Sequence, residues 1–389
     1  MADDPTRSGG TADDGTPPAI LSRKDLRARR SHRRWWWTLG AVAVLLVGTA
    51  AGLIATRNHH GASASTTSTA PTTTPGPTAT CPLTGTPAPG GAVPGRPALA
   101  VKIGNYSGDR PSAGLNQADV VFEEPVEGSY TRFVAVFQCQ GAPLVGDLRS
   151  AREPDVAILS QLSHPLFVHA GGINPVLALL AQAPIQDENV LAGASSVNVH
   201  PPGRVAPYST FASTTSMWGL APSDTSPPAP IFTYSAAPPA GAVPGSGASV
   251  HIPFSSDADV TWTWSTSSGQ YLRSYSGTPD RLIGGAQTAT TNVVIMTVQT
   301  FIGPWYENNV GGREVEVVAT GSGPLTVLRN GVAITGTWSR SSLTQPATLT
   351  DSAGQPITLQ PGSTWEELVP QGVPVTTAAT PTAPTTTRP

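Results

Sequence analysis

Short apolar runs separated by turn residues dominate the sequence between residues 98 and 370. In the first half of this region the runs cover residues 98–103, 119–122, 130–137 and 166–169. Runs of this length predict buried strands. Helical periodicity at 155–162, and the pair Asn174-Pro175 as N-cap and first helical position, predict two helices. Strands that alternate with helices are typical of an α/β fold, so we expect an α/β (α+β) domain over residues 81–212.

The second half of the region changes to one strand after another. The expected strands cover residues 250–254, 260–264, 270–275, 292–301, 314–319, 325–328, 332–338, 347–350 and 365–369. Asn330-Gly331 is a strong signal for a two-residue hairpin. We therefore expect a β-rich domain over 250–370, built as a β-sandwich or as a sheet packed on the first domain. Residues 213–249 are rich in Pro, Ala and Ser and are expected to connect the two domains.

An uncharged apolar run near the N-terminus predicts a membrane anchor. Residues 35–55 would cross a hydrocarbon core of about 30 Å as a helix of about 21 residues. Seven cations between Arg23 and Arg34 would hold the N-terminal side in the cytoplasm, and the tryptophans at 35–37 suit the interface. We expect a disordered cytoplasmic segment at 1–34, a single transmembrane helix at 35–55 and an exported remainder at the cell membrane. The alternative is a cleaved signal peptide, and it exports the remainder as well.

Two segments have the composition of linkers. Residues 56–80 form an expected Ser/Thr/Pro-rich stalk, and residues 371–389 an expected disordered Thr/Pro tail. Such tracts outside a cell are either plain linkers or carriers of O-glycans. Beyond Arg57 the chain has 13 cations against 20 anions, so nucleic acid is not expected as a partner.

Cys81 and Cys139 are the only cysteines in the chain. Because export exposes them to an oxidising compartment, we expect a disulfide between them. A loop of this size would contribute about 4 kcal/mol to stability in the chain-entropy picture. Lipidation of Cys81 is disfavoured, since this residue lies about 25 positions beyond the apolar run, a long way from the position that this chemistry requires.

Charged residues are concentrated between the buried strands of residues 101–152. They include Lys102, Asp109, Arg110, Asp119, Glu123, Glu124, Glu127, Arg132, Asp147, Arg149 and Arg152. Arg149 and Arg152 flank Ser150, and two arginines in this arrangement could hold a carboxylate or phosphate. Glu123 or Glu127 would serve as a general acid if burial raised its pKa.

Two sets of candidate residues follow from this stretch. The expected ligand-binding residues are Arg110, Glu124, Glu127, Arg132, Arg149, Ser150, Arg152 and His169, and the candidate catalytic residues are Glu123 and Glu127. The alternative is that these charges neutralise one another in a structural ion-pair network.

Other chemistry is poorly supported by spacing. His164 and His169 are separated by a proline and the other histidines are isolated, so neither a metal nor another cofactor is expected. Ser150 and Ser209 lack the surroundings of a nucleophile elbow. Trp262 and Trp264 would share one face of a strand, either as core residues or as sugar-stacking residues.

Several motifs occur here in the order in which the YerB-like family has them. They are Arg110-Pro-Ser-Ala-Gly-Leu, Ala118-Asp-Val-Val-Phe-Glu-Glu, Val126-Glu-Gly-Ser-Tyr-Thr-Arg-Phe, Arg149-Ser-Ala-Arg and His169-Ala-Gly-Gly, followed by Asn292-Val-Val, Gly321-Ser-Gly, Gly336-Thr-Trp and Leu359-Gln-Pro-Gly-Ser-Thr-Trp. The chain resembles this family over about residues 81–370. The resemblance implies a bacterial envelope protein of lipoprotein type with an α/β domain before a β-rich one. The family has no established activity.

Two positions depart from the pattern of that family. The Gly-Pro that usually precedes the Arg-Ser-Ala-Arg motif is Gly146-Asp147 here, and the usual Ala-Pro-His-Asn is Ala206-Pro207-Tyr208-Ser209. The second departure puts in doubt any mechanism that needs a histidine at that place.

The residues and the resemblance together predict a membrane-anchored, extracytoplasmic protein. We expect it to bind a cell-wall polymer or an envelope protein through the Arg/Glu cluster of its first domain. One alternative is a cell-wall hydrolase or transferase that uses a glutamate acid/base with Arg149 and Arg152. The other alternative is a structural scaffold of the envelope.

Overall fold

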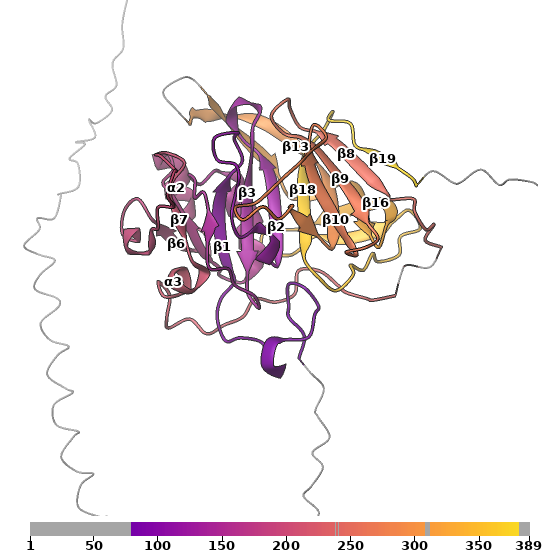
Figure 1. Cartoon of the computed structure of the whole chain (residues 1–389), viewed down its shortest axis with the longest axis horizontal. Coiled ribbons are helices and arrows are strands. Elements are labelled where there is room, and N and C mark those ends of the chain that lie inside the picture. The colour runs from indigo at the N-terminus through magenta and orange to yellow at the C-terminus, as the bar shows by residue number, and fades with distance from the viewer. Residues whose placement is uncertain (1–78, 238, 240, 308–311, 381–389) are drawn as a thin grey trace, which may run out of the picture. The chain divides into compact units, whose positions relative to one another are not determined.

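The structure is a computed structural model that describes residues 79–380, apart from 238, 240 and 308–311 (Figure 1). Most of it is β-structure, with a few short helices. The predicted cytoplasmic segment at 1–34, the predicted anchor at 35–55 and nearly all of the predicted stalk lie outside the described residues. No helix in the described part of the chain is long and apolar enough to cross a membrane.

A mixed sheet of eleven strands forms the centre of the molecule. Its strands are β1 (Leu99–Gly104), β2 (Val120–Pro125), β3 (Thr131–Phe137), β5 (Leu166–His169), β6 (Gln186–Asn189), β13 (Asn292–Tyr306), β14 (Arg313–Val318), β15 (Gly321–Arg329), β16 (Val332–Arg340), β17 (Thr348–Asp351) and β18 (Thr364–Pro370). Their order is β17-β16-β15-β13-β18-β2-β3-β1-β5-β6, and β14 pairs with the outer part of β13. Both halves of the chain therefore contribute to one sheet.

Strand β18 joins the two halves. It comes near the end of the chain, yet it lies between β13 and β2 and runs parallel to both. All residues of β2 and the first six residues of β18 are buried. Apart from Thr364, these buried residues are apolar or acidic. Strands buried on both faces need a neighbour on each edge, and β18 supplies that neighbour for β2. The predicted boundary between residues 81–212 and 250–370 thus runs through a continuous sheet.

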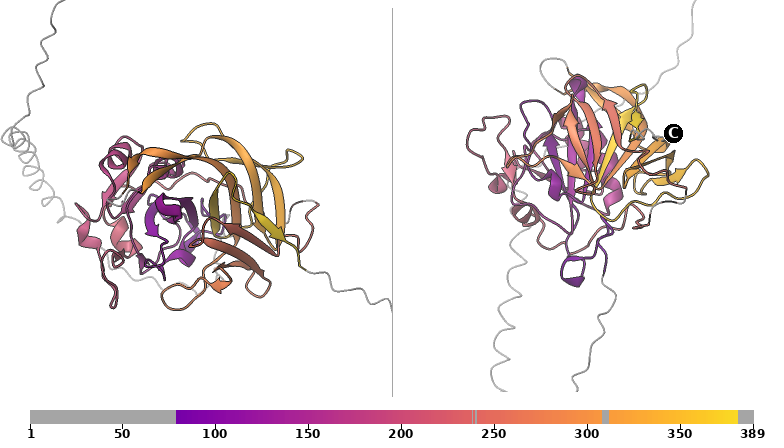
Figure 2. Two further views of the ribbon diagram at one scale, coloured as in Figure 1. Left: turned by 90° about the horizontal axis from the view of Figure 1, so that it is seen from above. Right: turned by 45° about the vertical axis from the view of Figure 1, so that its right-hand side comes forward.

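The two faces of the large sheet have different covers. Helices α1 (Pro154–Leu159) and α2 (Asn174–Leu180) bury Ile158, Leu159 and Leu180 against one face. A second, six-stranded sheet packs on the other face, where Trp262 and Tyr271 enter the core (Figure 2). Its strands are β8 (Ser249–Pro253), β9 (Asp259–Ser265), β10 (Gln270–Tyr275), β11 (Thr278–Pro279), β12 (Ala289–Thr290) and β19 (Thr376–Ala378). The remaining short elements are β4 (Val145–Gly146), β7 (Phe211–Ala212) and α3 (Thr214–Trp218).

Part of the predicted tail is ordered, which corrects the expectation of disorder over residues 371–389. Residues 376–378 form β19 and pair with residues 249–251 of β8. The edge of β8 offers backbone hydrogen-bond partners, and the β-branched Thr376 and Thr377 suit a strand at this edge. Residues 381–389 lie outside the described part of the chain.

The expected disulfide is present between Cys81 and Cys139, with the two Cα atoms 6.0 Å apart. It joins the start of the described region to the residues that follow β3. Asp119 supports the same corner from inside, because its carboxylate accepts hydrogen bonds from the backbone N–H groups of Gln138 (2.6 Å) and Cys139 (3.0 Å). Burial raises the pKa of Asp119 to about 6.

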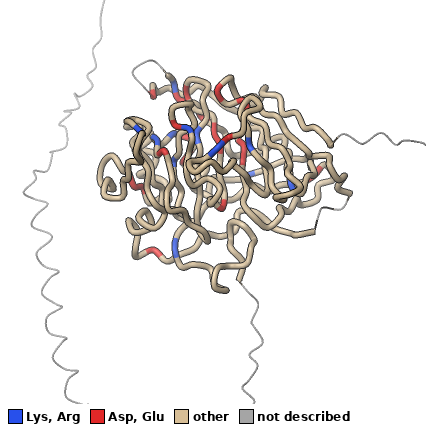
Figure 3. The backbone as a smooth tube through the Cα atoms, viewed as in Figure 1, with Lys and Arg blue, Asp and Glu red and all other residues tan. Residues whose placement is uncertain are grey.

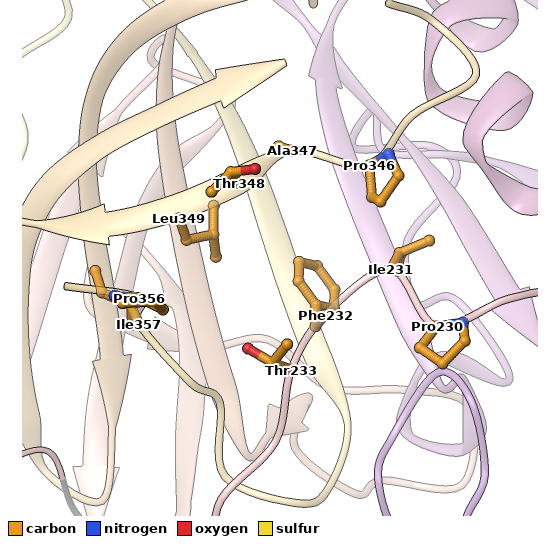
Figure 4. A pocket seen from close by; sticks show the side chains of 10 residues that line it. All are labelled: Pro230, Ile231, Phe232, Thr233, Pro346, Ala347, Thr348, Leu349, Pro356 and Ile357. Carbon is orange, nitrogen blue, oxygen red and sulfur yellow. The ribbon is translucent and has the colours of Figure 1, made fainter. Parts of the chain in front are cut away.

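The proline-rich connection is packed on the large sheet over part of its length. Ile231 and Phe232 are buried against the side chains of β16 and β17. Figure 4 shows Phe232 between Ile231 and Leu349. These side chains line a small, mainly apolar hollow of about 290 Å³. The guanidinium of Arg329 holds the next turn by donating to the carbonyl oxygens of Ser235 and Ala237.

Candidate binding site

The charged residues of the first half gather where β1, β2 and β5 end. Strands β1 and β5 are parallel, and β1 and β2 are both antiparallel to β3, so all three end at the same edge of the sheet. Figure 3 shows the charged residues concentrated toward this upper edge. Ligand sites of α/β folds lie outside the carboxyl ends of such strands. This edge is therefore the place to look for a site.

Glu124 lies on the helix-covered face of the sheet, within an ion-pair network that has no opening to solvent. Its carboxylate accepts a hydrogen bond from the ammonium of Lys102, which also donates to Asp155 Oδ1 at 2.7 Å. All three side chains are fully buried. Burial, followed by the charge of Asp155, raises the pKa of Glu124 to about 8, although Lys102 acts in the opposite direction.

Glu123 points to the opposite face, because consecutive residues of a strand alternate. There its Oε2 accepts a hydrogen bond from Arg273 Nη2 of β10 at 2.6 Å and one from Trp365 Nε1 at 3.3 Å. Its Oε1 accepts a hydrogen bond from the hydroxyl of Thr131 at 2.7 Å. The guanidinium of Arg273 also lies 4.3 Å from the ring centre of Tyr275. Glu123 thus fastens the second sheet to the first.

A second buried carboxyl group, that of Glu367 on β18, lies beside Glu123. Burial and the negative charge of Glu123 raise the pKa of Glu367 well above its ordinary value. The indole N–H of Trp262 donates to Glu367 Oε1 at 2.7 Å. These contacts lie between the two sheets, where no ligand has access.

Glu127 belongs to a third group, in the turn η3 (Glu127–Ser129) that follows β2. Arg152 binds its carboxylate with two hydrogen bonds, from Nε at 2.8 Å and from Nη2 at 2.5 Å, and Arg132 lies 3.6 Å away. Burial alone would raise the pKa of Glu127. The hydrogen bonds from Arg152 and the charges of both arginines together lower it below its ordinary value. Glu127 is therefore ionised, and both of its oxygens are already bound by Arg152.

The Arg-Ser-Ala-Arg loop is fixed to the neighbouring strands through its backbone. Arg132 Nη1 donates to the carbonyl of Ser150 at 2.7 Å, and the Arg149 N–H donates to the carbonyl of Lys102 at 3.0 Å. The hydroxyl of Ser150 donates to the carbonyl of Ala170 at 3.1 Å. Burial, with the charge of Arg152, lowers the pKa of Arg132 to about 10.

His169 and Arg110 lie apart from this group. The buried ring of His169 is hydrogen-bonded to Asp187 Oδ1 at 2.8 Å and to the carbonyl of Gly171 at 2.6 Å. Arg110 extends toward the second sheet and donates to the carbonyl of Asp257 at 2.9 Å. The structure brings together four of the expected site residues, namely Glu127, Arg132, Ser150 and Arg152. Glu124 lies beside them on the same face of the sheet. Glu123, Arg110 and His169 lie elsewhere.

Arg149 is more exposed than Arg132 and Arg152, since 20% of its side chain is accessible against 10% and 4%. It donates to Asp109 Oδ1 at 2.7 Å and lies 5.2 Å from the ring centre of Tyr208. Tyr106 stacks on Tyr208 with 6.2 Å between ring centres and meets Tyr130 edge to face at 4.9 Å. We call Tyr106, Tyr130, Tyr208 and Arg149 the tyrosine face.

The sequence predictions did not include the three tyrosines of this face. Tyr106 and Tyr130 each lie one or two residues from an end of a buried strand, and Tyr208 takes the place of the family histidine. Their positions next to strand ends, and at the place of the family histidine, were the sequence features that could have indicated a site. Planar aromatic rings around a cation suit a ligand with sugar rings or a negative charge. In the described residues, no three histidine, cysteine or acidic side chains are grouped as metal ligands would be.

Comparison with known proteins finds one family. Residues 83–226 match the N-terminal domain of the "Protein of unknown function (DUF3048)" family, and residues 250–365 match its C-terminal domain. Over 73 residues the chain is 47% identical to "Putative lipoprotein YerB" of Bacillus subtilis (strain 168). This match covers 19% of this chain and 22% of that protein. The sequence match thus spans about a fifth of this curated relative.

A crystal structure of YerB protein from Bacillus subtilis has the same fold. The TM-score is 0.66 at 23% sequence identity, and the match covers 77% of this chain and 99% of that chain. At this identity the likeness extends to the fold alone.

Proposed function

We propose, since this chain belongs to the DUF3048 family of proteins of unknown function, that it is an envelope-associated protein that binds an anionic or sugar-like component of the cell envelope. The name of its Bacillus relative, "Putative lipoprotein YerB", supports the location. The predicted anchor at 35–55 and the disulfide agree with an exported protein. The finer topology, with a cytoplasmic N-terminus and the bulk outside, is part of the proposal.

The observation that carries the proposal is the exposure of Arg149 among the tyrosines. Lys102, Glu124, Glu123, Glu127 and Arg152 are buried in ion pairs within the protein, so they have little capacity left for a ligand. Arg149 has one guanidinium nitrogen on Asp109, and the rest of the group lies beside an aromatic surface. A carboxylate or phosphate bound there would gain a charge-assisted hydrogen bond, and a sugar ring would stack on tyrosine.

Binding is better supported than acid catalysis at this location. A general acid must hold a proton near neutral pH and reach the substrate. Glu127 has a lowered pKa and two hydrogen bonds from Arg152. Glu123 is fully buried between the sheets. For the wall-hydrolase alternative, Glu127 would have to separate from Arg152, or Glu123 from Arg273, before either could act on a substrate.

A structural scaffold is the second candidate. The buried networks around Lys102 and Arg273 support it, because they connect α1, the large sheet and the second sheet through charged side chains. In that case the tyrosine face would bind no ligand.

The test compares retention of the full-length chain, in detergent, on purified cell-wall material. Arg149→Ala and Tyr208→Ala should each reduce the affinity about tenfold, the value of one charge-assisted hydrogen bond or ring contact. Arg281→Ala is the matched control, since this exposed arginine lies between β11 and β12 and donates to the carbonyl of Gly285. Equal retention of all four proteins would overturn the assignment of the tyrosine face and favour the scaffold. Release of soluble wall fragments would favour the enzyme.

A further inference from the structure

Strand β18 ends before its neighbour β13 does. The last pair between them joins Pro370 to Val298, while β13 continues to Tyr306. On the other side, β2 runs to Pro125 and turns into η3. Beyond Pro370, β18 gives way to a slot that is bounded by the β13–β14 hairpin and the η3 turn.

The outer part of β13 is paired on one edge by β14. Residues 299–302 of β13 pair with 315–318 of β14. The chain then leads from β14 directly into β15, which pairs with β13 on the edge opposite to β18, so β14 lies on that edge as well. The Gln371 N–H donates to the carbonyl of Val298 at 2.9 Å, so the backbone groups of Val298 face the edge that β18 occupies. Because backbone groups of alternate residues point to opposite edges, those of Thr300 and Ile302 face the slot. Among the described strands, none pairs with this edge beyond Val298.

The slot is a groove of about 560 Å³. Thr300 and Ile302 of β13 line one wall together with Arg313 and Val315 of β14. The η3 turn with Tyr130 forms the other wall, and Phe254 and Val373 lie among the lining side chains. Ile302 is 65% exposed. An apolar groove beside an unpaired strand edge has the two features by which sheets bind extended peptides, namely backbone hydrogen bonds and pockets for alternate side chains.

We propose that this groove binds an extended peptide segment of another envelope protein as an added strand that continues the line of β18. The backbone N–H and C=O groups of Thr300 and Ile302 pair with the segment. Its inward side chains are apolar and rest against Phe254 and Val373. The groove shares Tyr130 with the tyrosine face. Thr300 and Ile302 belong to the groove alone, whereas Arg149 and Tyr208 belong to the tyrosine face alone, so variants at these residues let either proposal fail without the other.

Charge selects an acidic segment. Arg313 lines the groove and is exposed, with its guanidinium 5.7 Å from the ring centre of Tyr306. No carboxylate of the described residues lies within ion-pair distance of it. Glu127, the acidic residue of the opposite wall, is neutralised by Arg152. The peptide therefore carries an aspartate or glutamate next to its apolar residues.

The probe is a synthetic decapeptide of alternating Val and Thr with one central Asp, added to the full-length chain in detergent. Hydrogen exchange of the amides in residues 299–303 is the readout. The Thr300 and Ile302 amides should exchange quickly without the probe and about tenfold more slowly with it. The same peptide N-methylated at every residue should give no protection, and a Lys version should bind more weakly.

Two variants localise the effect. Thr300→Pro removes an N–H that faces the slot and leaves the edge paired with β14 intact, whereas Thr300→Val keeps that N–H. The probe should bind the valine variant and not the proline variant, while both melt like the wild type. If Thr300→Pro does not fold, Ile302→Asp takes its place, because it adds a negative charge at an exposed position.

Several results would overturn the proposal. They are protection of both amides before the probe is added, no protection with it, and binding that survives N-methylation. Protection that rises with protein concentration alone would assign the groove to a second copy of the chain. The same protection from a wall-derived glycan oligomer would assign it to a sugar.

Discussion

Lys102 places an ammonium group between two buried carboxylates, those of Glu124 and Asp155. Transfer of each ion from water costs several kcal/mol, and the mutual attraction offsets this cost only while all partners are present. Lys102→Met should therefore lower the free energy of unfolding by about 3–5 kcal/mol, measured by urea denaturation. Lys102→Met/Glu124→Met should recover part of the loss, since it removes one of the two uncompensated anions. A double variant less stable than the single one would show that the network is not electrostatic in origin.

Asp119 predicts a pH dependence of stability. Its pKa is raised from 3.8 to about 6 by burial, so the folded state holds this proton more tightly than the unfolded state does. The contribution is fully present below about pH 4 and is lost as the pH rises through about 6, a change of about 3 kcal/mol. Asp119→Asn should lack this change, while the other buried carboxyl groups act equally in both proteins. The difference in unfolding free energy between variant and wild type should thus rise between pH 4 and 7. A constant difference would contradict the assignment.

Among the candidate site residues, Glu127, Arg132 and Arg152 meet in the structure. Their expected role in binding a ligand stays a prediction. Glu123 was placed in the same cluster, although its parity relative to Glu124 puts it on the opposite face. Its partner Arg273 is 150 positions away and belongs to another sheet, and no local pattern reports such a contact.

At the scale of elements, periodicity was a good guide to the existence of strands. The structure confirms the strands expected at 166–169 and 270–275, and the hairpin at Asn330-Gly331, where both residues have positive φ. Pairing was not predictable. The run at 365–369 was expected within a separate β-rich domain, but it forms β18 between β13 and β2. When two buried strands have similar composition, the sequence does not indicate which strand each of them pairs with.

The position of β18 gives a prediction about truncation. A chain that ends at Ser363 lacks this strand, so β2 and β13 lose their shared neighbour and Glu123 loses the indole of Trp365. It should show no cooperative thermal transition by circular dichroism. A chain that ends at Thr380 keeps β18 and β19 and should melt like the full chain. A cooperative transition in the shorter chain would mean that the sheet closes without β18.

At the scale of the whole molecule, the two halves matched by the two domain models are tied together in several ways. Strand β18 pairs with β2, and Arg273 neutralises Glu123 across the sheets. Asn116 accepts a hydrogen bond from the Ala289 N–H at 3.0 Å and donates to the carbonyl of Gln287 at 2.9 Å. Neither half is complete without the other, although the family models divide the chain between them.

The late place of β18 in the chain has a consequence for biogenesis. A polypeptide emerges from the ribosome, or through an export channel, with its N-terminus first. The first half lacks the strand that pairs with β2 until residues 364–370 arrive, so its sheet stays incomplete through most of synthesis. For the exported protein proposed above, this order would delay folding of the first half during translocation, and β18 would complete the sheet only on the far side of the membrane.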